Sequence, residues 1–258
     1  MKITVFTSNQ PRHLHLLREL SKIAENVYAI QECRTLYPGE TEDFYSATPV
    51  MKRYFWNVMQ AEKATFRNVA FLPKRVQQLA IRMGDLNKMS MSEIGRALSS
   101  DIFVTFGCSY IKGQLCDYLI EREAINIHMG ISPYYRGADC NFWAMYDGRP
   151  EFVGATIHYL TKGLDSGDVL FYALPRPMKY KPFQLGMAAV KEAHIMLSSY
   201  LTGAFECKAE KQDKKNEIRY SRYEDFTDAV AQEYLDRLPT PGQIGKRLVE
   251  NLIRPTAQ

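Results

Sequence analysis

Apolar and polar residues alternate along this chain in two periods, one typical of buried strands and one typical of helices. The run KITVFTS at 2–8 is continuously apolar and rich in β-branched residues, as in a strand that is buried on both faces. Leucines at helical spacing follow it, with Ser8 or Asn9 as a candidate cap and Pro11 in the first turn. A second apolar run, NVYAIQE at 26–32, completes a predicted βαβ unit and favours a parallel sheet.

The same two periods continue through the rest of the chain. They predict further strands at 101–107, 124–128, 152–160 and 169–175. They predict helices at 47–66, 74–86, 90–100, 110–123, 138–148 and 182–205, and two shorter ones at 224–238 and 241–254. Thr48 and Pro49 suit the start of the first of these helices, and Ser90 with Glu93 forms a capping-box pattern.

This order of elements predicts an α/β fold with a Rossmann-like, mostly parallel sheet, flanking helices and a small C-terminal appendage. We expect a catalytic domain over 1–205 and a short helical extension over 206–258. That extension could cap the core, pair with a second copy as a homodimer, or cover a substrate cleft. Within the less regular segment 33–68, residues 35–46 are loop-like. The aromatic residues of 44–66 (Tyr45, Tyr54, Phe55 and Trp56) are expected in the core or in a dimer contact.

Composition narrows the class of protein. The 258 residues are 46% hydrophobic, which is ordinary for a globular domain, and the sequence contains no apolar run of membrane-spanning length and no signal-peptide pattern. We therefore expect a cytoplasmic protein that does not bind a membrane. The five cysteines form no CxxC pair, so neither a disulfide scaffold nor a metal site is predicted. A net charge of +4 favours an anionic ligand but is too small to indicate nucleic acid.

The strand at 124–128 ends in a pair of polar side chains that could act on one carbonyl group. Asn126 and His128 are two residues apart, so they point to the same face of a strand. Ligands of open α/β sheets bind beyond the carboxyl ends of the strands. An amide there can donate a hydrogen bond to a carbonyl oxygen, and an imidazole can transfer a proton. Taken alone, the pair is better interpreted as a core amide and imidazole bonded to local backbone.

A third candidate lies in the loop TKGLDSGDVL at 161–170. Gly163 and Gly167 bracket Asp165, and a buried carboxylate near a histidine would fix its tautomer and raise its pKa. The alternative is an aspartate that caps its own turn. His158, on the preceding strand, is expected to support the site or the structure rather than to act in catalysis.

Together these segments resemble the core of the folate-dependent formyltransferases, a family that includes glycinamide ribonucleotide transformylase, methionyl-tRNA formyltransferase and the sugar N-formyltransferases. The resemblance covers about residues 1–205 and is carried by Asn-x-His at 126–128, GISPYYRG at 130–137 and GLDSGD at 163–168. The loop departs from the family, because GIS replaces Ser-Leu-Leu before Pro133.

The resemblance implies both the chemistry and the co-substrate, 10-formyltetrahydrofolate. Asn126 would polarise the formyl oxygen, His128 would stabilise the tetrahedral intermediate and shuttle a proton, and Asp165 would orient His128 and help to deprotonate the amine. The pterin would lie against GCSYIK at 107–112 and the loop at 160–165. The cofactor-binding candidates there are Tyr110, Lys112, Leu160, Thr161, Lys162 and Gly163.

The sequence gives less direct information on the identity of the acceptor amine. The turn TSNQPRH at 7–13 has no glycine, unlike the phosphate-binding turn of glycinamide ribonucleotide transformylase. The 206–258 tail is short for the RNA-binding domain of methionyl-tRNA formyltransferases. The strand beginning at residue 2 leaves no room for the N-terminal domain of a formyltetrahydrofolate hydrolase. A sugar N-formyltransferase acting on a nucleotide-linked dideoxy amino hexose is therefore the leading hypothesis.

Arg12, Tyr135 and Arg136 are the candidate substrate-binding residues, because a guanidinium can bind a phosphate and an aromatic ring can stack on a sugar or a base. Each could instead serve only packing or solvation. Two alternatives for the whole protein stay open: a formyltransferase for methionyl-tRNA or another small amine, and a non-catalytic folate- or nucleotide-binding module. Nucleic acid is not the expected partner.

Overall fold

The structure is a computed structural model that describes residues 1–35, 47–67 and 71–250. Its centre is a seven-stranded sheet in the order β3-β2-β1-β4-β5-β7-β8. The strands of this sheet are β1 (Lys2–Thr7), β2 (Asn26–Cys33), β3 (Val76–Arg82), β4 (Ile102–Thr105), β5 (Ile125–His128), β7 (Ala155–Tyr159) and β8 (Val169–Ala173). A second, two-stranded sheet consists of β6 (Tyr135–Gly137) and β9 (Arg219–Ser221).

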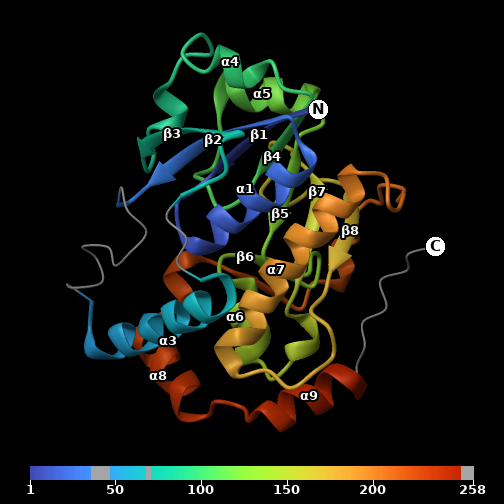
Figure 1. Ribbon diagram of the computed structural model, residues 1–258. Coiled ribbons are helices and arrows are strands. Elements are labelled where there is room, and N and C mark those ends of the chain that lie inside the picture. The colour runs from blue at the N-terminus through green and yellow to red at the C-terminus, as the bar shows by residue number, and fades with distance from the viewer. Residues whose placement is uncertain (36–46, 68–70, 251–258) are drawn as a thin grey trace.

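The helices surround the large sheet and extend beyond one of its ends (Figure 1). They are α1 (Pro11–Ile23), α3 (Pro49–Phe66), α4 (Gly95–Leu98), α5 (Gly113–Glu121), α6 (Cys140–Tyr146), α7 (Pro182–Leu201), α8 (Asp228–Asp236) and α9 (Pro241–Glu250). Short 3-10 turns lie at Leu86–Lys88, Pro150–Phe152, Lys214–Asn216 and Tyr223–Asp225. Within the described residues, none of these helices combines the length and the apolar character that crossing a bilayer requires.

The strand directions confirm the predicted α/β fold with a mostly parallel sheet. Strands β3, β2, β1, β4 and β5 run parallel to one another, whereas β7 is antiparallel to both β5 and β8. The β1-α1-β2 unit closes as the apolar pattern predicts, because α1 presents its leucines to the sheet. The register of β5 with β7 sets Asn126 opposite His158, which brings two polar side chains together.

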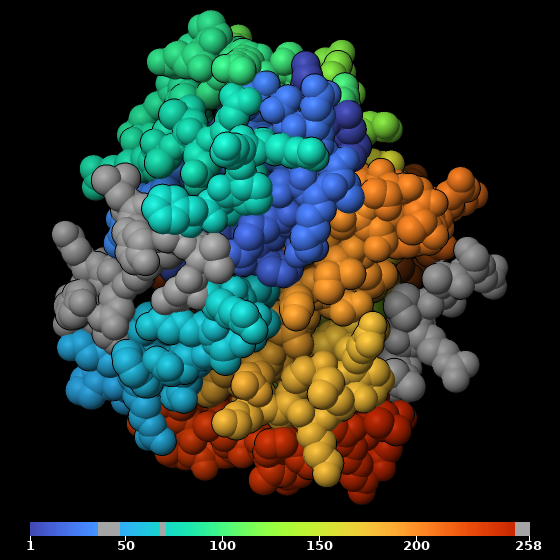
Figure 2. All heavy atoms as spheres, viewed as in Figure 1, coloured from blue at the N-terminus to red at the C-terminus, as the bar shows by residue number. Residues whose placement is uncertain are grey.

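Three apolar clusters hold these layers together. Helices α1 and α7 cover one face of the sheet, and α5 with the α4 segment covers the other. A third cluster joins α3, α6, α8 and α9 to the start of α7, below the sheet in Figure 1. Figure 2 shows the tail helices (red) along this end of the molecule, beside α3 and the start of α7.

One predicted helix is wrong. Residues 74–86 were expected to be helical, yet Val76–Arg82 form β3 at the edge of the sheet, paired in parallel with β2. The strand is largely exposed, so its side chains do not show the apolar run of a central strand. The spacing of its polar and apolar residues is therefore similar to that of an amphipathic helix. Backbone pairing with β2 nevertheless makes the segment a strand.

Cap predictions were partly right. Thr48 caps α3, accepting a hydrogen bond from the Met51 amide at 3.2 Å. At α1 the N-cap position is Gln10 rather than Ser8 or Asn9, and its side chain makes no capping hydrogen bond. The Asn9 amide donates to the Thr35 carbonyl. In the 90–100 segment, Glu93 does accept from Ser90, but the helix is confined to Gly95–Leu98.

The aromatic residues of α3 divide between core and surface. Tyr54 is buried in the third apolar cluster, whereas Phe55 and Trp56 are exposed. The predicted loop at 35–46 lies outside the described residues except for its first position, and Tyr45 lies outside them entirely. The tail does contact the rest of the chain, since β9 pairs in parallel with β6.

Candidate active site

Strand β5 positions two of the three predicted residues at the carboxyl end of the parallel strands. The hydroxyl of Thr105, on β4, donates to Asn126 Oδ1 at 2.6 Å and so fixes the orientation of the amide. His128 ends the strand and is buried. Ligands of open α/β sheets bind at such strand ends, and the fold therefore places both side chains where chemistry is expected.

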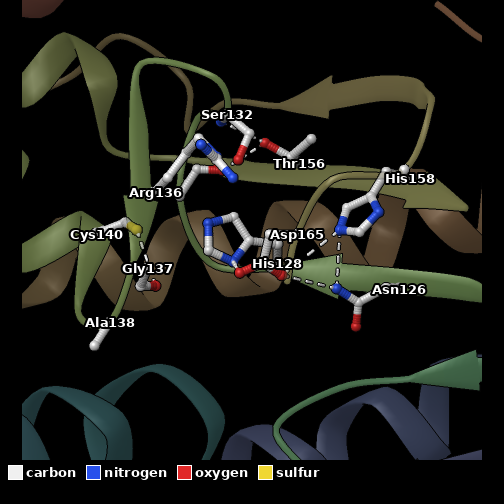
Figure 3. A network of polar contacts seen from close by, with 12 residues as sticks. Asn126, His128, Ser132, Arg136, Gly137, Ala138, Cys140, Thr156, His158 and Asp165 are labelled. Atoms are coloured by element: carbon white, nitrogen blue, oxygen red, sulfur yellow. Dashed lines mark hydrogen bonds and ion pairs between the residues drawn. The ribbon is translucent and has the colours of Figure 1, made fainter. Parts of the chain in front are cut away.

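The loop after β5 turns tightly around the His128 ring. A Cβ atom on Gly130 would lie 2.4 Å from Cys140 Cβ and 2.7 Å from His128 Nε2, so only glycine fits. The Thr156 hydroxyl donates to the Gly130 carbonyl at 2.6 Å and accepts from the Ser132 amide at 2.9 Å. These bonds, shown in part in Figure 3, hold the loop close to the imidazole.

The loop between β7 and β8 brings Asp165 inward. Asp165 adopts a left-handed backbone conformation with φ 45°, which is uncommon outside glycine and is tolerated by aspartate. A Cβ on Gly167 would lie 1.8 Å from the Tyr159 carbonyl oxygen, so this turn also requires glycine. The tail residue Gln212 donates to the carbonyls of Asp165 and Gly167 at 3.0 and 2.8 Å. The Gln212 side chain thus holds the backbone of the loop that carries the carboxylate.

The structure brings Asn126, His128 and Asp165 together (Figure 3). Asp165 Oδ2 lies 3.1 Å from His128 Nδ1, and the Asn126 amide donates to Asp165 Oδ1 at 3.3 Å. The Asp165 carboxylate thus contacts both the Asn126 amide and the His128 imidazole, and this set of groups suits general acid–base chemistry at a carbonyl.

His158 belongs to the same network and lines the first cavity beside Asn126. Its Nδ1 donates to the Tyr159 carbonyl at 2.8 Å, so its Nε2 is the acceptor of the Asn126 amide at 2.9 Å. His158 Nε2 lies 3.7 Å from Asp165 Oδ1. These contacts orient Asn126 and agree with the supporting position expected for His158.

The electrostatics of the site favour a charged imidazole. Burial disfavours the imidazolium, but the charge of Asp165 and its hydrogen bond outweigh burial and raise the pKa of His128 to about 10. Burial acts against the charged form of Asp165 as well, and His128 outweighs it, so that the pKa of Asp165 is lowered. His128 Nε2 is buried and has no hydrogen-bond partner among the described residues. A proton on this nitrogen is therefore available to an oxyanion.

Two cavities meet at His128. The first, of about 290 Å³, lies between the segment that follows β4 and the loop that carries Asp165. The second, of about 340 Å³, lies between α3, α6, α7 and α8. His128 and Met129 line both cavities, so one imidazole separates two spaces that could each hold a reactant. Asn126 and Asp165 line the first cavity only.

The predicted cofactor-binding residues lie in or beside the first cavity. Tyr110, Leu160, Thr161 and Gly163 line it, and the Tyr110 hydroxyl donates to the Lys162 carbonyl. Among the described residues, Lys112 and Lys162 do not belong to its wall. The Lys162 ammonium pairs with Asp117 at 2.6 Å, and the Lys112 ammonium lies 5.9 Å from the centre of the Tyr110 ring.

The predicted substrate-binding residues line neither cavity in the described part of the chain. Arg12 pairs with Glu62 at 2.9 Å. Tyr135 is buried, and its hydroxyl donates to Asp147 at 3.2 Å. Arg136 pairs with Glu217 of the tail at 2.9 Å. Each side chain is thus engaged within the fold.

Sequence reasoning missed the residues of the second cavity. They are Tyr54 of α3, Phe142 and Met145 of α6, Phe183 of α7, Tyr234 of α8, and Asp139 just before α6. Their aromatic and apolar side chains carry the same periodic signal as core residues, so no local pattern distinguishes them. Gln212 holds the Asp165 loop by a hydrogen bond. It lies in a charged stretch of the sequence that is typical of a solvated connector, so the sequence does not distinguish it.

Comparison with known proteins places the chain in a family. Residues 1–176 match the family model for formyl transferase, and the chain belongs to that family. Among curated relatives, the methionyl-tRNA formyltransferase of Thermosynechococcus vestitus is 31% identical over 121 residues, covering 44% of this chain and 36% of that protein. The match thus spans little more than a third of the relative.

Solved structures share the fold at low sequence identity. Glycinamide ribonucleotide transformylase 1 from Symbiobacterium toebii has a TM-score of 0.52 and 14% identity, covering 82% of this chain and 92% of that one. The N-formyltransferase from Helicobacter canadensis, in complex with folinic acid and dTDP-3-aminofucose, has a TM-score of 0.51 and 12% identity, covering 88% and 72%. These similarities confirm the formyltransferase fold predicted from the sequence.

Proposed function

We propose that this protein transfers the formyl group of 10-formyltetrahydrofolate to the amine of a nucleotide-linked dideoxy amino hexose. The observation that carries the proposal is the pair of cavities that meet at His128. Formyl transfer needs a donor and an acceptor on either side of one reacting carbon, with proton-transfer groups between them. Here His128 lies between the two cavities, and Asn126 and Asp165 line the first cavity beside it.

The first cavity is the proposed donor site. Its wall includes consecutive residues of the 105–111 and 163–165 segments, which offer backbone amides and carbonyls to a pterin. The exposed ring of Tyr110 adds an aromatic face at the same wall. The Helicobacter canadensis protein, which shares the fold, holds folinic acid, and this supports a folate as the donor.

The triad accounts for the chemical steps. The amine nitrogen attacks the formyl carbon, and the carbonyl electron pair moves to oxygen, which accepts hydrogen bonds from His128 Nε2–H and the Asn126 amide. The Asn126 bond to Asp165 is long at 3.3 Å and is the one exchanged for the formyl oxygen. The electron pair on oxygen then re-forms the carbonyl as the carbon–N10 bond breaks. His128 gives its Nε2 proton to N10, and the neutral imidazole takes one proton from the amine, which restores the charged His128–Asp165 pair.

The acceptor assignment is supported by two observations. The Helicobacter canadensis structure contains dTDP-3-aminofucose on a chain with this fold. In addition, the second cavity is lined by aromatic side chains, which suit the apolar face of a sugar ring. The similarity to methionyl-tRNA formyltransferase favours methionyl-tRNA as the second candidate, although the match spans 44% of this chain.

A turnover panel tests the proposal. Purified protein is incubated with 10-formyltetrahydrofolate and, separately, with dTDP-linked 3-amino and 4-amino dideoxy hexoses, their UDP-linked counterparts, methionyl-tRNA and glycinamide ribonucleotide. We expect tetrahydrofolate release and a formamide product, by mass spectrometry, with an amino sugar only. Product with methionyl-tRNA alone would replace the acceptor assignment. Folate binding without any turnover would instead identify a non-catalytic binding module.

A further inference from the structure

The second cavity contains an acidic residue in an unusual setting. Asp139 immediately precedes α6, where an aspartate ordinarily accepts a hydrogen bond from the first turn of the helix. Its side chain makes no such bond, and its backbone is left-handed, with φ 54° and ψ 34°. A left-handed conformation is unfavourable for a residue with a Cβ atom. The local fold therefore turns this carboxylate away from the helix that it would otherwise cap.

The Asp139 side chain opens into the cavity instead. Asp139 is exposed, and it lines the same cavity as His128. Burial by the surrounding protein nevertheless raises its pKa. In the part of the chain that the structure describes, no hydrogen bond or ion pair is recorded for its carboxylate. An acidic group that faces a concave, partly desolvated space without a partner is suited to a cation or a hydrogen-bond donor from a ligand.

Asp139 is followed in the chain by Cys140, which lies beside the His128 ring. The Cys140 Cβ and the His128 Nε2 both lie within 3 Å of where a Cβ of Gly130 would stand, so they flank the same point. Asp139 is thus one residue from a side chain that lies beside the imidazole (Figure 3 shows Cys140 and His128). A ligand group held by Asp139 therefore shares with His128 the cavity that Asn126 and Asp165 do not line.

The walls of the cavity around Asp139 are aromatic. Tyr54 and Phe142 are 5.6 Å apart between ring centres, and Phe142 and Tyr234 are 5.1 Å apart, in edge-to-face contacts. Phe183 of α7 completes the group. Among the described residues, the lining includes neither lysine nor arginine. This cavity suits a compact ring that carries an amine and does not suit a phosphate.

We propose that Asp139 binds the amino group of the acceptor and holds it against His128, while the aromatic group formed by Tyr54, Phe142, Phe183 and Tyr234 packs on the acceptor ring. The inference rests on the proposed function and narrows it: the amine-bearing ring occupies the second cavity, and any nucleotide phosphates lie outside it. Asp139 is then the residue by which the protein distinguishes an amino sugar from the corresponding hydroxyl sugar.

Calorimetry with paired ligands tests this assignment. The probes are the dTDP-linked 3-amino and 4-amino dideoxy hexoses and their hydroxyl counterparts, titrated at pH 7 in the presence of tetrahydrofolate. For the wild type we expect about 10- to 100-fold tighter binding of an amino sugar than of its hydroxyl counterpart, since hydrogen bonds to charged groups are strong. Asp139→Asn should abolish this preference and leave hydroxyl-sugar and tetrahydrofolate binding unchanged.

Two further variants keep the test decisive. Asp139→Gly removes the carboxylate and favours the left-handed backbone, so it should reproduce the loss of preference even if Asp139→Asn folds poorly. Asp228→Asn, at an exposed position on α8, makes the same charge change and should retain wild-type discrimination. An unchanged amine preference in both Asp139 variants would overturn the role of Asp139. Failure of the proposed function looks different: the wild type would bind tetrahydrofolate but no amino sugar, and both inferences would fall.

Discussion

The charge on His128 depends on one carboxylate at 3.1 Å. A buried imidazole alone would favour the neutral form, as the lowered pKa values of the buried residues His13 and His194 show. The pKa of His128 is raised instead of lowered, because Asp165 supplies an opposite charge within the same buried space. Buried acid–base pairs of this kind are typical of catalytic sites.

This pair makes stability depend on pH in a defined direction. The pKa of His128 is raised, so its contribution is complete below the unfolded value of about 6.5 and is lost as pH rises toward about 10. The pKa of Asp165 is lowered, so its contribution is present above about pH 4 and is lost at lower pH. We expect the pair to stabilise the fold most between about pH 4 and 6.5.

Urea unfolding of the wild type and of Asp165→Asn across pH 4 to 10 measures this effect. Removing one partner of a buried ion pair costs about 3–5 kcal/mol. The variant should therefore be least stable relative to the wild type near pH 5–6, and the difference should shrink toward pH 10. Asp228→Asn, which alters an exposed carboxylate, should show no such dependence. A constant difference between wild type and Asp165→Asn would contradict the assigned pKa of His128.

Catalysis should be more sensitive than stability to the same residues. Replacing His128 with asparagine removes the proton that faces the cavity junction and should lower kcat about 10²- to 10⁴-fold. Tetrahydrofolate binding should change little, because most of the donor cavity is formed by other segments. Single-turnover formyl transfer, compared with fluorescence-detected folate binding, separates the two effects. A variant that loses both equally would indicate that His128 mainly supports the fold of the site.

At the scale of elements, the donor cavity depends on a segment that follows β3. Glu32, fully buried at the end of β2, accepts from the Gly84 amide at 2.8 Å and from the Ser109 amide at 2.6 Å. Asn87 donates to the Tyr110 carbonyl at 2.9 Å and accepts from the Lys112 amide at 2.7 Å. Two side chains thereby hold the loop that forms one wall of the cavity.

Glu32→Gln should disturb this wall selectively. An amide cannot accept hydrogen bonds from both sides as a carboxylate does, so one of the bonded backbone amides would be left without its acceptor. At about 1–3 kcal/mol for such a loss, we expect KM for 10-formyltetrahydrofolate to rise about tenfold or more, with KM for the acceptor unchanged. Glu121→Gln, exposed on α5, is the matched control. Equal changes in both KM values would argue against a specific role for the loop.

At the scale of the whole molecule, the tail takes part in both halves of the site. Gln212 anchors the loop of Asp165, β9 pairs with β6 beside the catalytic turn, and Tyr234 of α8 lines the second cavity. We propose that residues 1–205 hold the triad and the donor cavity, and that 206–258 form an extension that completes the acceptor cavity. A cleft-completing role is thus favoured over the other two roles left open for the tail.

Gly137→Ala tests this dependence on the tail. Gly137 has φ 89°, and a Cβ there would lie 2.0 Å from the Ser221 carbonyl oxygen of β9. Backbone strain and overpacking together should cost about 2–4 kcal/mol and separate β9 from β6. Gly148→Ala is the control: φ is 69° but a Cβ there would meet nothing within 4 Å, so only about 1–2 kcal/mol of strain is expected.

Urea unfolding and acceptor KM distinguish the two glycine variants. The acceptor KM should rise in Gly137→Ala and stay near the wild-type value in Gly148→Ala, because only the first disturbs the contact between tail and catalytic loop. If both variants lose the same stability and keep the same KM, the tail does not shape the acceptor site.

The sequence alone predicted most of the local elements and the three side chains, Asn126, His128 and Asp165, that the structure brings together. Periodicity is a property of each segment, so α1, α3 and β5 could be recognised from the faces that they bury. The motifs that hold Asn126, His128 and Asp165 are short and contiguous, and the strand end and the glycine turn that they need are encoded beside them.

Only the tertiary structure decided what depends on residues far apart. Within the segment 74–86, for which a helix was predicted, the chain forms β3, because pairing with β2 supplies the backbone hydrogen bonds. Arg12 forms an ion pair with Glu62, and Arg136 forms one with Glu217. These partners are distant in the sequence, so no local pattern predicts the pairs. The second cavity is formed by four helices separated in sequence, and its aromatic residues carry the same signal as a core. Local spacing shows that a side chain is buried, whereas the packing of distant segments decides whether it faces another side chain or a cavity.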